Sequence, residues 1–190
     1  MLEKLKEWDQ SLLLYLNSFH LDPIDPIMYQ LTQTLPWVPM YLFLSYLVWK
    51  VYGKQCWWVF IAIGLTILFA DKTASGIFKP YFERLRPCHE PNLQGLVYNF
   101  RHCGGMYGFA SSHASTSFSV ATIMTLVLGT TYPALRWLFL WAAFFSFTRI
   151  YLGVHYPGDV LVGALIGILS AWSAYHIMLW VKRKIIPDTP

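Results

Sequence analysis

Three short motifs hold most of the side chains in this chain that could do chemistry. Together they supply three cations, two histidines and one carboxylate. The motifs are Lys79-x6-Arg86-Pro87, Ala110-Ser111-Ser112-His113 and Arg149-x5-His155-x3-Asp159. Fixed cations neutralise a phosphate and its transition state, and histidines act as nucleophiles or proton donors. The residue types therefore favour phosphoryl transfer.

The third motif can orient a histidine nucleophile. Proline suits the first turn of a helix, so we expect a helix to begin at Pro157, with Asp159 in its opening turn. The positive end of the helix dipole keeps that carboxylate ionised. The carboxylate then accepts one ring N–H of His155 and leaves the other ring nitrogen free to attack.

The second motif predicts an anion site with a proton donor beside it. Ser111 or Ser112 can cap a helix running from Ala114, whose first backbone N–H groups would point at an anion. His113 is then placed to protonate a leaving oxygen. Taken alone, each motif is commonly an ordinary helix cap or a cation that reaches lipid headgroups. All three occurring together at the ends of apolar runs favours a single site.

The elements that must hold these motifs are apolar helices. Only 13% of the residues are charged, and 56% are apolar. Five apolar runs span residues 27–51, 57–78, 114–128, 135–150 and 160–181. At a rise of about 1.5 Å per residue, most are long enough to cross a hydrocarbon layer of ~30 Å. We expect an all-α, polytopic transmembrane bundle with about five spans, and a polar contact between helices for Asp71.

Residues 1–21 are predicted to form an amphipathic helix in the membrane interface. Apolar residues recur at helical spacing on one face, namely Leu2, Leu5, Trp8, Leu12, Tyr15 and Phe19. The segment has neither the basic start nor the continuous apolar stretch of a signal peptide. We therefore interpret residues 1–190 as one domain, with a long outer loop at 79–113.

Charge predicts which side of the membrane holds the motifs. Lys and Arg in short loops favour the cytoplasm. Six of them fall on the side opposite the motifs: Lys50, Lys54, Arg136, Lys182, Arg183 and Lys184. We therefore expect a multi-pass protein of the inner membrane whose motifs face the periplasm. There Cys88 and Cys103 could form a disulfide, or remain two unpaired loop cysteines.

The joint pattern resembles the type 2 phosphatidic acid phosphatase superfamily over residues 57–181. The resemblance implies general acid catalysis by His113, a phosphohistidine on His155 and orientation of His155 by Asp159. It also implies phosphate binding by five residues: Lys79, Arg86, Ser111, Ser112 and Arg149. The chain departs from the family where Ala110 and Ser112 replace the Pro and Gly of Pro-Ser-Gly-His. The family uses no metal, so no cofactor is expected.

The resemblance implies an integral membrane phosphatase that acts on a lipid phosphate and has no nucleic-acid partner. Undecaprenyl pyrophosphate is the first-ranked substrate, because the site is expected to face outward. The alternatives are phosphatidylglycerophosphate or phosphatidic acid phosphatase and lipid A phosphatase or phosphotransferase.

A non-hydrolytic lipid-phosphate transporter would leave the histidines unused, and a purely structural role would leave all three motifs unexplained. A related haloperoxidase activity occurs in soluble proteins. The sequence does not determine the oligomeric state.

Overall fold

The computed structural model describes residues 2–101 and 103–185. Regular structure in this part of the chain is helical, apart from one antiparallel bridge between Leu85 and Tyr107. The α-helices are α1 (Leu2–Asn17), α2 (Asp25–Leu31), α3 (Val38–Tyr52), α4 (Cys56–Asp71), α5 (Lys79–Phe82), α6 (Ser112–Leu128), α7 (Leu138–Tyr151) and α8 (Pro157–Ile185). Short 3₁₀ turns lead into α3, α4 and α7 at Leu35–Trp37, Gly53–Gln55 and Pro133–Trp137.

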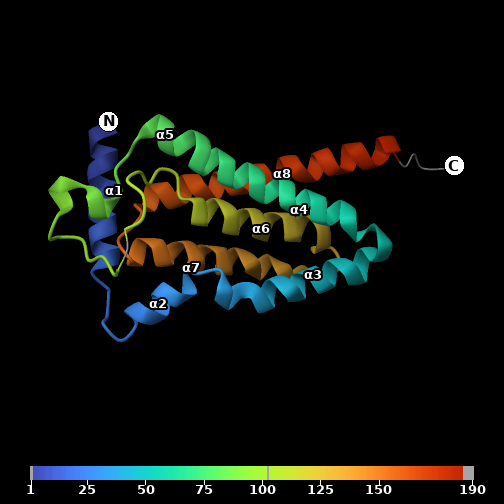
Figure 1. Ribbon diagram of the computed structural model, residues 1–190, viewed down its shortest axis with the longest axis horizontal. Coiled ribbons are helices and arrows are strands. Elements are labelled where there is room, and N and C mark those ends of the chain that lie inside the picture. The colour runs from blue at the N-terminus through green and yellow to red at the C-terminus, as the bar shows by residue number, and fades with distance from the viewer. Residues whose placement is uncertain (1, 102, 186–190) are drawn as a thin grey trace.

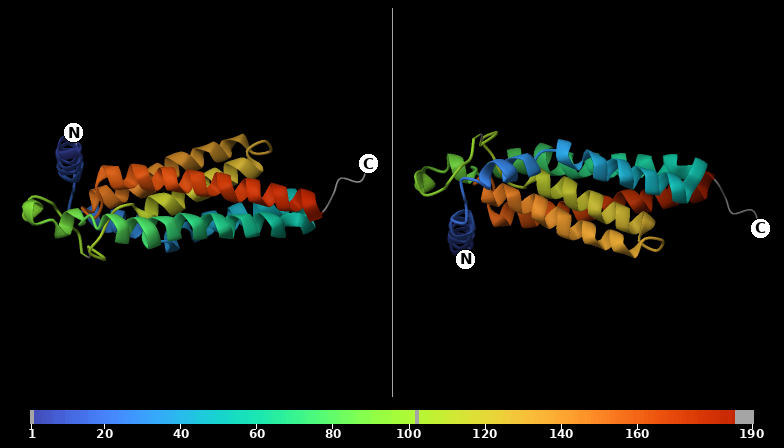
Figure 2. Two further views of the ribbon diagram at one scale, coloured as in Figure 1. Left: turned by 90° about the horizontal axis from the view of Figure 1, so that it is seen from above. Right: turned by 90° about the horizontal axis from the view of Figure 1, so that it is seen from below.

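The helices form an elongated bundle. Helices α3, α4, α6, α7 and α8 run along its long axis, whereas α1 lies crosswise at one end (Figure 1). Figure 2 shows α1 end-on from both directions, to one side of that bundle end. Each of the five predicted apolar runs is helical over most of its length. The all-α architecture is therefore as expected.

The helices differ in whether they are long enough to cross a membrane. Two helical stretches are long and apolar enough to cross a membrane, Leu35–Phe82 and Pro157–Ile185. Helices α6 and α7 contain 17 and 14 residues and are shorter than this. The count of five spans remains a prediction.

Helix α6 lies at the centre of the bundle because small residues let α8 approach it closely. A methyl group on Gly163 would collide with the carbonyl oxygen of Ser111, and one on Gly167 with that of Ser115. Spacing of small residues by four along a helix allows this backbone contact. Farther along the bundle from this contact, α3, α4, α6 and α8 share an apolar core. It includes Val48, Val59, Ile123, Leu128 and Ala171.

The helical path that starts with α4 extends beyond residue 79, where the outer loop was predicted to begin. It continues through a π-helical stretch, Lys72–Phe78, into the short helix α5. The helical path ends at Phe82, after which Glu83 adopts a left-handed conformation with φ of 46°. A π-helical turn changes the direction of the side chains that follow it, and such turns are frequent at functional sites.

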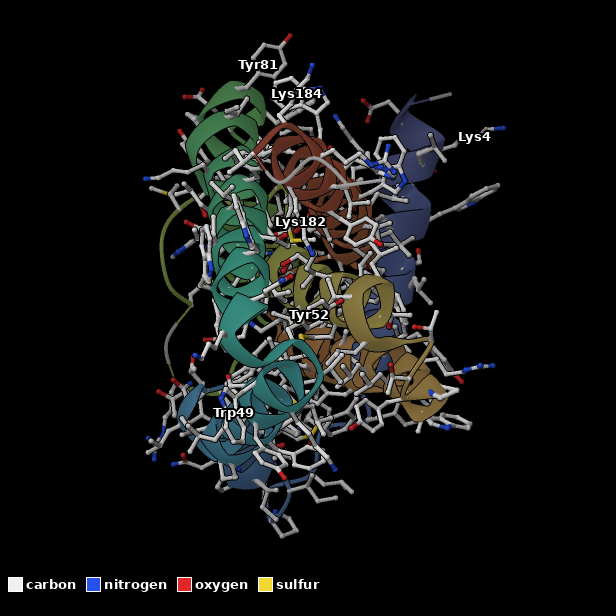
Figure 3. The ribbon with its side chains drawn as sticks, turned by 90° about the vertical axis from the view of Figure 1, so that its right-hand side faces the viewer. Lys4, Trp49, Tyr52, Tyr81, Lys182 and Lys184 are labelled. Carbon is white, nitrogen blue, oxygen red and sulfur yellow. A yellow bond between two sulfur atoms is a disulfide. The ribbon has the colours of Figure 1, made fainter. Side chains whose placement is uncertain are left out.

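Helix α1 has the expected apolar face. Leu5, Trp8 and Leu12 are among its exposed apolar side chains, whereas the neighbouring Leu13 is fully buried. Lys4 points away from the bundle (Figure 3). The helix ends at Asn17 and not at residue 21. The side chain of Leu2 lies outside the described part of the structure.

A buried polar cluster fastens the N-terminal segment to the same end of the bundle. The Asn17 amide donates to the carbonyl oxygens of Tyr98, 3.0 Å away, and Tyr151, 2.8 Å away. The hydroxyls of Tyr98 and Tyr151 both donate to the fully buried carboxylate of Asp25. The bond to Asp25 raises the pKa of Tyr98 to about 12. Burial acts to raise the pKa of Asp25, but these hydroxyls hold it below its usual value.

The loop between α5 and α6 closes the bundle end that carries α1. Two short 3₁₀ turns shape it, Pro87–His89 and Pro91–Leu93. Cys88 and Cys103 are joined in a disulfide, with their Cα atoms 6.0 Å apart, which is the pairing that the sequence left open.

Candidate active site

The third motif forms a histidine–carboxylate pair between α7 and α8. Helix α8 begins at Pro157 as predicted, so His155 precedes it and Asp159 lies in its first turn. His155 Nδ1 is 3.3 Å from Asp159 Oδ2, and both side chains are buried. The backbone N–H of Tyr156 also donates to Asp159 Oδ2, at 3.0 Å. This geometry places a proton on Nδ1 of His155 and leaves Nε2 as the reactive nitrogen.

The surroundings of His155 keep its ring neutral. Burial, followed by the charges of Arg86, Arg149 and Lys79, lowers the pKa of His155 well below its usual value. A neutral imidazole keeps the lone pair on Nε2 that a nucleophile needs. Gly108 lies directly over the pair, because a methyl group there would come within 3.1 Å of Asp159 Oδ2. A larger residue would press on the carboxylate.

Arg86 faces Nε2 of His155, and Arg149 lies close enough for its charge to act on the same ring; each guanidinium has an unused donor. Arg86 Nη1 is 3.3 Å from His155 Nε2 and 3.4 Å from the carbonyl oxygen of Val154. Arg149 Nη1 donates to Thr32 Oγ1 at 2.9 Å. The Nε atoms of both guanidinium groups are buried and have no partner among the described residues. Such donors suit an anion bound beside Nε2.

The second motif begins α6, as the sequence predicted. Ser111 is the N-cap, and its Oγ accepts the N–H of Ala114 at 3.5 Å. Its own N–H donates to the carbonyl oxygen of Asp159 at 3.0 Å, which ties the second motif to the third. Ser111 is fully buried at the helix start, and it is not among the residues that line the cavity described below. His113 does face the cavity, with its ring stacked on Phe145.

Ser112, the residue that replaces the family's glycine, contacts the first motif. Its Oγ accepts from Lys79 Nζ at 2.7 Å and lies 2.7 Å from Ser75 Oγ. Ser75 in turn donates to Asp71 Oδ1 at 3.1 Å. Asp71 therefore reaches α6 through Ser75, and Lys79 is held at the start of α6 by a hydroxyl that glycine would lack.

The site opens in two directions. A cavity of about 540 Å³ extends from Ser112 and His113 into the bundle. Its walls are mostly apolar and include Tyr41, Leu44, Ile63, Ile67, Val120, Met124 and Phe145. A second opening, of about 480 Å³, is lined by polar groups that include Ser75, Lys79, Glu83 and Arg86. Such a pair of openings suits a molecule with an apolar body and a phosphate group.

The structure also adds residues that the sequence had not indicated. Arg84 donates to Asp159 Oδ1 at 2.9 Å and to Asp9 Oδ2 at 2.8 Å. The only signal for Arg84 was its position two residues before Arg86. Nothing in the sequence pointed to Asp9 on α1 or to Thr32 beside Arg149, because these contacts join distant parts of the chain.

Comparisons with known proteins agree with this arrangement. Residues 55–183 match the model of the PAP2 superfamily. A lipid A 4′-phosphatase of Bacteroides thetaiotaomicron is 38% identical to this chain, over 100% of this chain and 85% of that protein. A lipid A 4′-phosphatase of Porphyromonas gingivalis is 30% identical, over 96% of this chain and 78% of that protein.

A solved structure has the same fold. The crystal structure of Aquifex aeolicus LpxE superimposes with a TM-score of 0.63 at 25% identity, covering 88% of this chain and 94% of that one. The two long apolar helical stretches are typical of an integral membrane protein. The resemblance inferred from the three motifs is thus confirmed: the chain belongs to the PAP2 superfamily and is a membrane lipid phosphatase.

Proposed function

We propose that the protein removes the 4′-phosphate of lipid A through a phosphohistidine on His155. The observation that carries the choice of lipid is the similarity, along the whole chain, to two proteins named lipid A 4′-phosphatase. The resemblance and the predicted outward-facing site had favoured undecaprenyl pyrophosphate, with lipid A among the alternatives; the similarity to these two proteins reverses that order. The reaction itself is supported by the buried His155–Asp159 pair with Arg86 beside Nε2.

In the first step, His155 Nε2 attacks the phosphorus atom. The N–P bond forms as the bond from phosphorus to the sugar oxygen breaks. Burial and the neighbouring cations lower the pKa of His113, and the negative charge of the bound phosphate offsets those cations, so that His113 is protonated in the complex and gives its proton to that oxygen. Asp159 holds the Nδ1 proton of His155 and balances the positive charge that develops on the ring. The negative charge of the transferring phosphoryl group lies against Lys79, Arg86 and Arg149.

In the second step, water attacks the phosphohistidine. His113, now neutral, accepts a proton from the water, and the N–P bond breaks to release inorganic phosphate and restore His155. This step needs only the chain's own residues, so we propose a metal-independent hydrolase. The apolar cavity would hold the acylated part of the lipid, and the polar opening would admit water and release phosphate.

The orientation of the protein in the membrane follows from the distribution of its positive charges. We infer that the long helices cross the inner membrane and that the active site lies at its periplasmic face. The support is charge: Lys50, Lys54, Arg136 and the basic end of α8 lie in segments at the opposite end of the bundle (Figure 1). Positive residues in short loops favour the cytoplasm.

The experiment is a phosphate-release assay on the purified protein in detergent with EDTA. Its panel holds lipid A, undecaprenyl pyrophosphate, phosphatidylglycerophosphate and phosphatidic acid. We expect kcat/KM for lipid A to exceed the others by about 10-fold or more, with mass spectrometry locating the loss at the 4′ position. His155→Ala should lower kcat by at least about 10⁴-fold.

Three results would count against separate parts of the proposal. Equal or faster hydrolysis of undecaprenyl pyrophosphate would return it to first rank. Loss of activity in EDTA, restored by a divalent cation, would contradict the metal-independent mechanism. Activity that survives in His155→Ala would remove His155 as the nucleophile.

A further inference from the structure

Arg84 lies between the catalytic carboxylate and the crosswise helix α1. Its two terminal nitrogens contact different carboxylates, Asp159 at 2.9 Å and Asp9 at 2.8 Å. The guanidinium also stacks on the ring of Tyr156, 3.8 Å from its centroid. Only 26% of the Arg84 side chain is exposed, against 15% for Asp9 and none for Asp159. The planar group is therefore held on three sides, unlike a surface ion pair.

Asp9 makes a second contact, with the helix that carries Asp159. Its Oδ1 accepts the backbone N–H of Gly158, in the first turn of α8, at 2.7 Å. The first N–H groups of a helix have no partner inside it, and the helix dipole favours an anion there. A methyl group on Gly158 would come within 2.7 Å of Asp9, so glycine allows this approach. One carboxylate from α1 thus binds both Arg84 and the start of α8.

These contacts settle the orientation of Asp159. Its Oδ2 faces His155 Nδ1 and the N–H of Tyr156, whereas its Oδ1 accepts from Arg84. Without Arg84, the carboxylate could rotate about its Cβ–Cγ bond and lose its alignment with His155. A buried carboxylate also needs an opposing charge, and Arg84 supplies the one in direct contact.

We propose that Arg84 is a positioning residue for the His155–Asp159 pair and that Asp9 makes α1 a working part of the active site. The docking of α1 on the bundle then sets the alignment of His155 through Arg84 and Asp159, which are 75 residues apart along the chain. The inference rests on the proposed role of His155 and does not depend on which lipid is hydrolysed.

The first test is a double-mutant cycle, measured with the panel lipid that the wild-type protein hydrolyses fastest. Arg84→Gln should lower kcat by about 100-fold, with KM changed less than about 3-fold, because misalignment of a catalytic group affects the chemical step. In an Asp159→Asn background, the same change should have little further effect. Arg84→Lys, which keeps the charge, should restore part of the loss. Equal losses of activity in both backgrounds would overturn the inference.

The second test examines the link through α1. Asp9→Asn keeps an oxygen for Gly158 but removes the charge that faces Arg84, so we expect kcat to fall by about 10-fold. Glu7→Gln is the matched control, because Glu7 is an exposed acid on the same helix. It should leave kcat unchanged. Equal effects of the two substitutions would overturn the role of Asp9.

A pH profile separates positioning from a loss of folded protein. The charged and titratable groups that face His155 are Lys79, Arg84, Arg86, His113, Arg149 and Asp159. Arg84 is one of the cations that lower the pKa of His155, so its removal raises that pKa. The acid limb of kcat/KM should therefore move to higher pH in Arg84→Gln. A lower kcat/KM at every pH, with the acid limb at the same pH as in the wild type, would contradict the inference.

The two proposals fail in different ways. If His155→Ala remains active, the nucleophile is wrong and the role of Arg84 falls with it. If His155→Ala is inactive but Arg84→Gln retains wild-type kcat, only the positioning role is wrong. Thermal unfolding of each variant in detergent should stay within a few degrees of the wild type. A large drop in Tm that accounts for the lost activity would make Arg84 a structural residue and overturn the inference.

Discussion

Charged side chains are buried at one end of the bundle and exposed at the other. At the end that carries α1, Arg84, Arg86 and Asp159 are largely buried, and their partners come from distant segments. At the opposite end, Lys182 donates to Gln55 at 3.0 Å in an exposed contact. Figure 3 looks onto this second end, with Lys182 and Tyr52 in view. Charge alone therefore does not mark a site; burial with unused donors does.

The interiors next to the two ends differ as well. Near the candidate active site, polar side chains connect α1, α2 and α7, as Asn17, Asp25 and Tyr151 do. Toward the other end, the core of α3, α4, α6 and α8 is apolar. Packing stabilises this apolar half, and directed hydrogen bonds hold the polar half. Three substitutions test this contrast, in order of expected effect on stability.

Leu128→Ala should have the largest effect on stability and little effect on kcat. Leu128 is fully buried at the apolar end of α6. Its truncation leaves a cavity, so the free energy of unfolding should fall by about 2–5 kcal/mol. Thermal unfolding in detergent and the phosphate-release assay measure the two quantities. A kcat that falls as much as in Arg84→Gln would show that the two halves are not independent.

Tyr151→Phe should have an intermediate effect, confined to the polar half. The hydroxyl donates to Asp25 at 2.6 Å and accepts from the N–H of Leu21 at 2.9 Å. Its loss leaves buried polar groups with fewer partners, at a cost of about 1–3 kcal/mol. Limited proteolysis should cut the segment between α1 and α2 sooner than in the wild type. Unchanged proteolysis and unfolding would contradict the clamping role of Asp25.

The same substitution has a pH signature. Hydrogen bonds hold the pKa of Asp25 below its usual value of 3.8 in the folded state. The stabilisation by its carboxylate is therefore present above about pH 4 and is lost as the pH falls through the folded-state pKa. Tyr151→Phe removes one of these bonds, so the difference in stability between variant and wild type should shrink in acid.

Lys182→Gln should have the smallest effect. The contact of Lys182 with Gln55 is exposed. Exposed contacts of this kind contribute little, so the free energy of unfolding should change by less than about 0.5 kcal/mol. The kcat should stay at the wild-type value. A loss of activity here would mean that this end contributes to catalysis.

The sequence indicated the parts of the site that depend on local geometry. Pro157, between His155 and Asp159, predicts a helix that begins after His155 and carries Asp159 in its first turn. The structure has this arrangement, and the two side chains are in contact. A serine-capped helix running from Ala114 was predicted for the second motif, and the structure has this helix with Ser111 as its cap and its first residue at Ser112. The sequence could not distinguish the two serines, because which hydroxyl faces the cavity depends on contacts with Lys79 and α8.

Contacts between distant segments could not be inferred from spacing. Asp9 reaches Gly158 across 149 residues, and Thr32 reaches Arg149 across 117. In each case the partner is an ordinary polar residue of a helix or turn. The crosswise docking of α1, which creates the first contact, depends on the packing of Leu13 against a cluster that includes Ile150 and Tyr156. No periodicity in α1 specifies that surface.

The number of residues in the π-helical stretch Lys72–Phe78 determines the direction in which Lys79 points. Removing one residue from this stretch would let the helix continue in the regular α form and would turn Lys79 by about 100° around the axis. Ser75 and Lys79 could then no longer both meet Ser112. Every residue type of the proposed mechanism would still be present, yet the proposed phosphate site would lack a cation. Insertions and deletions in this membrane helix are therefore as informative about activity as substitutions in the motifs.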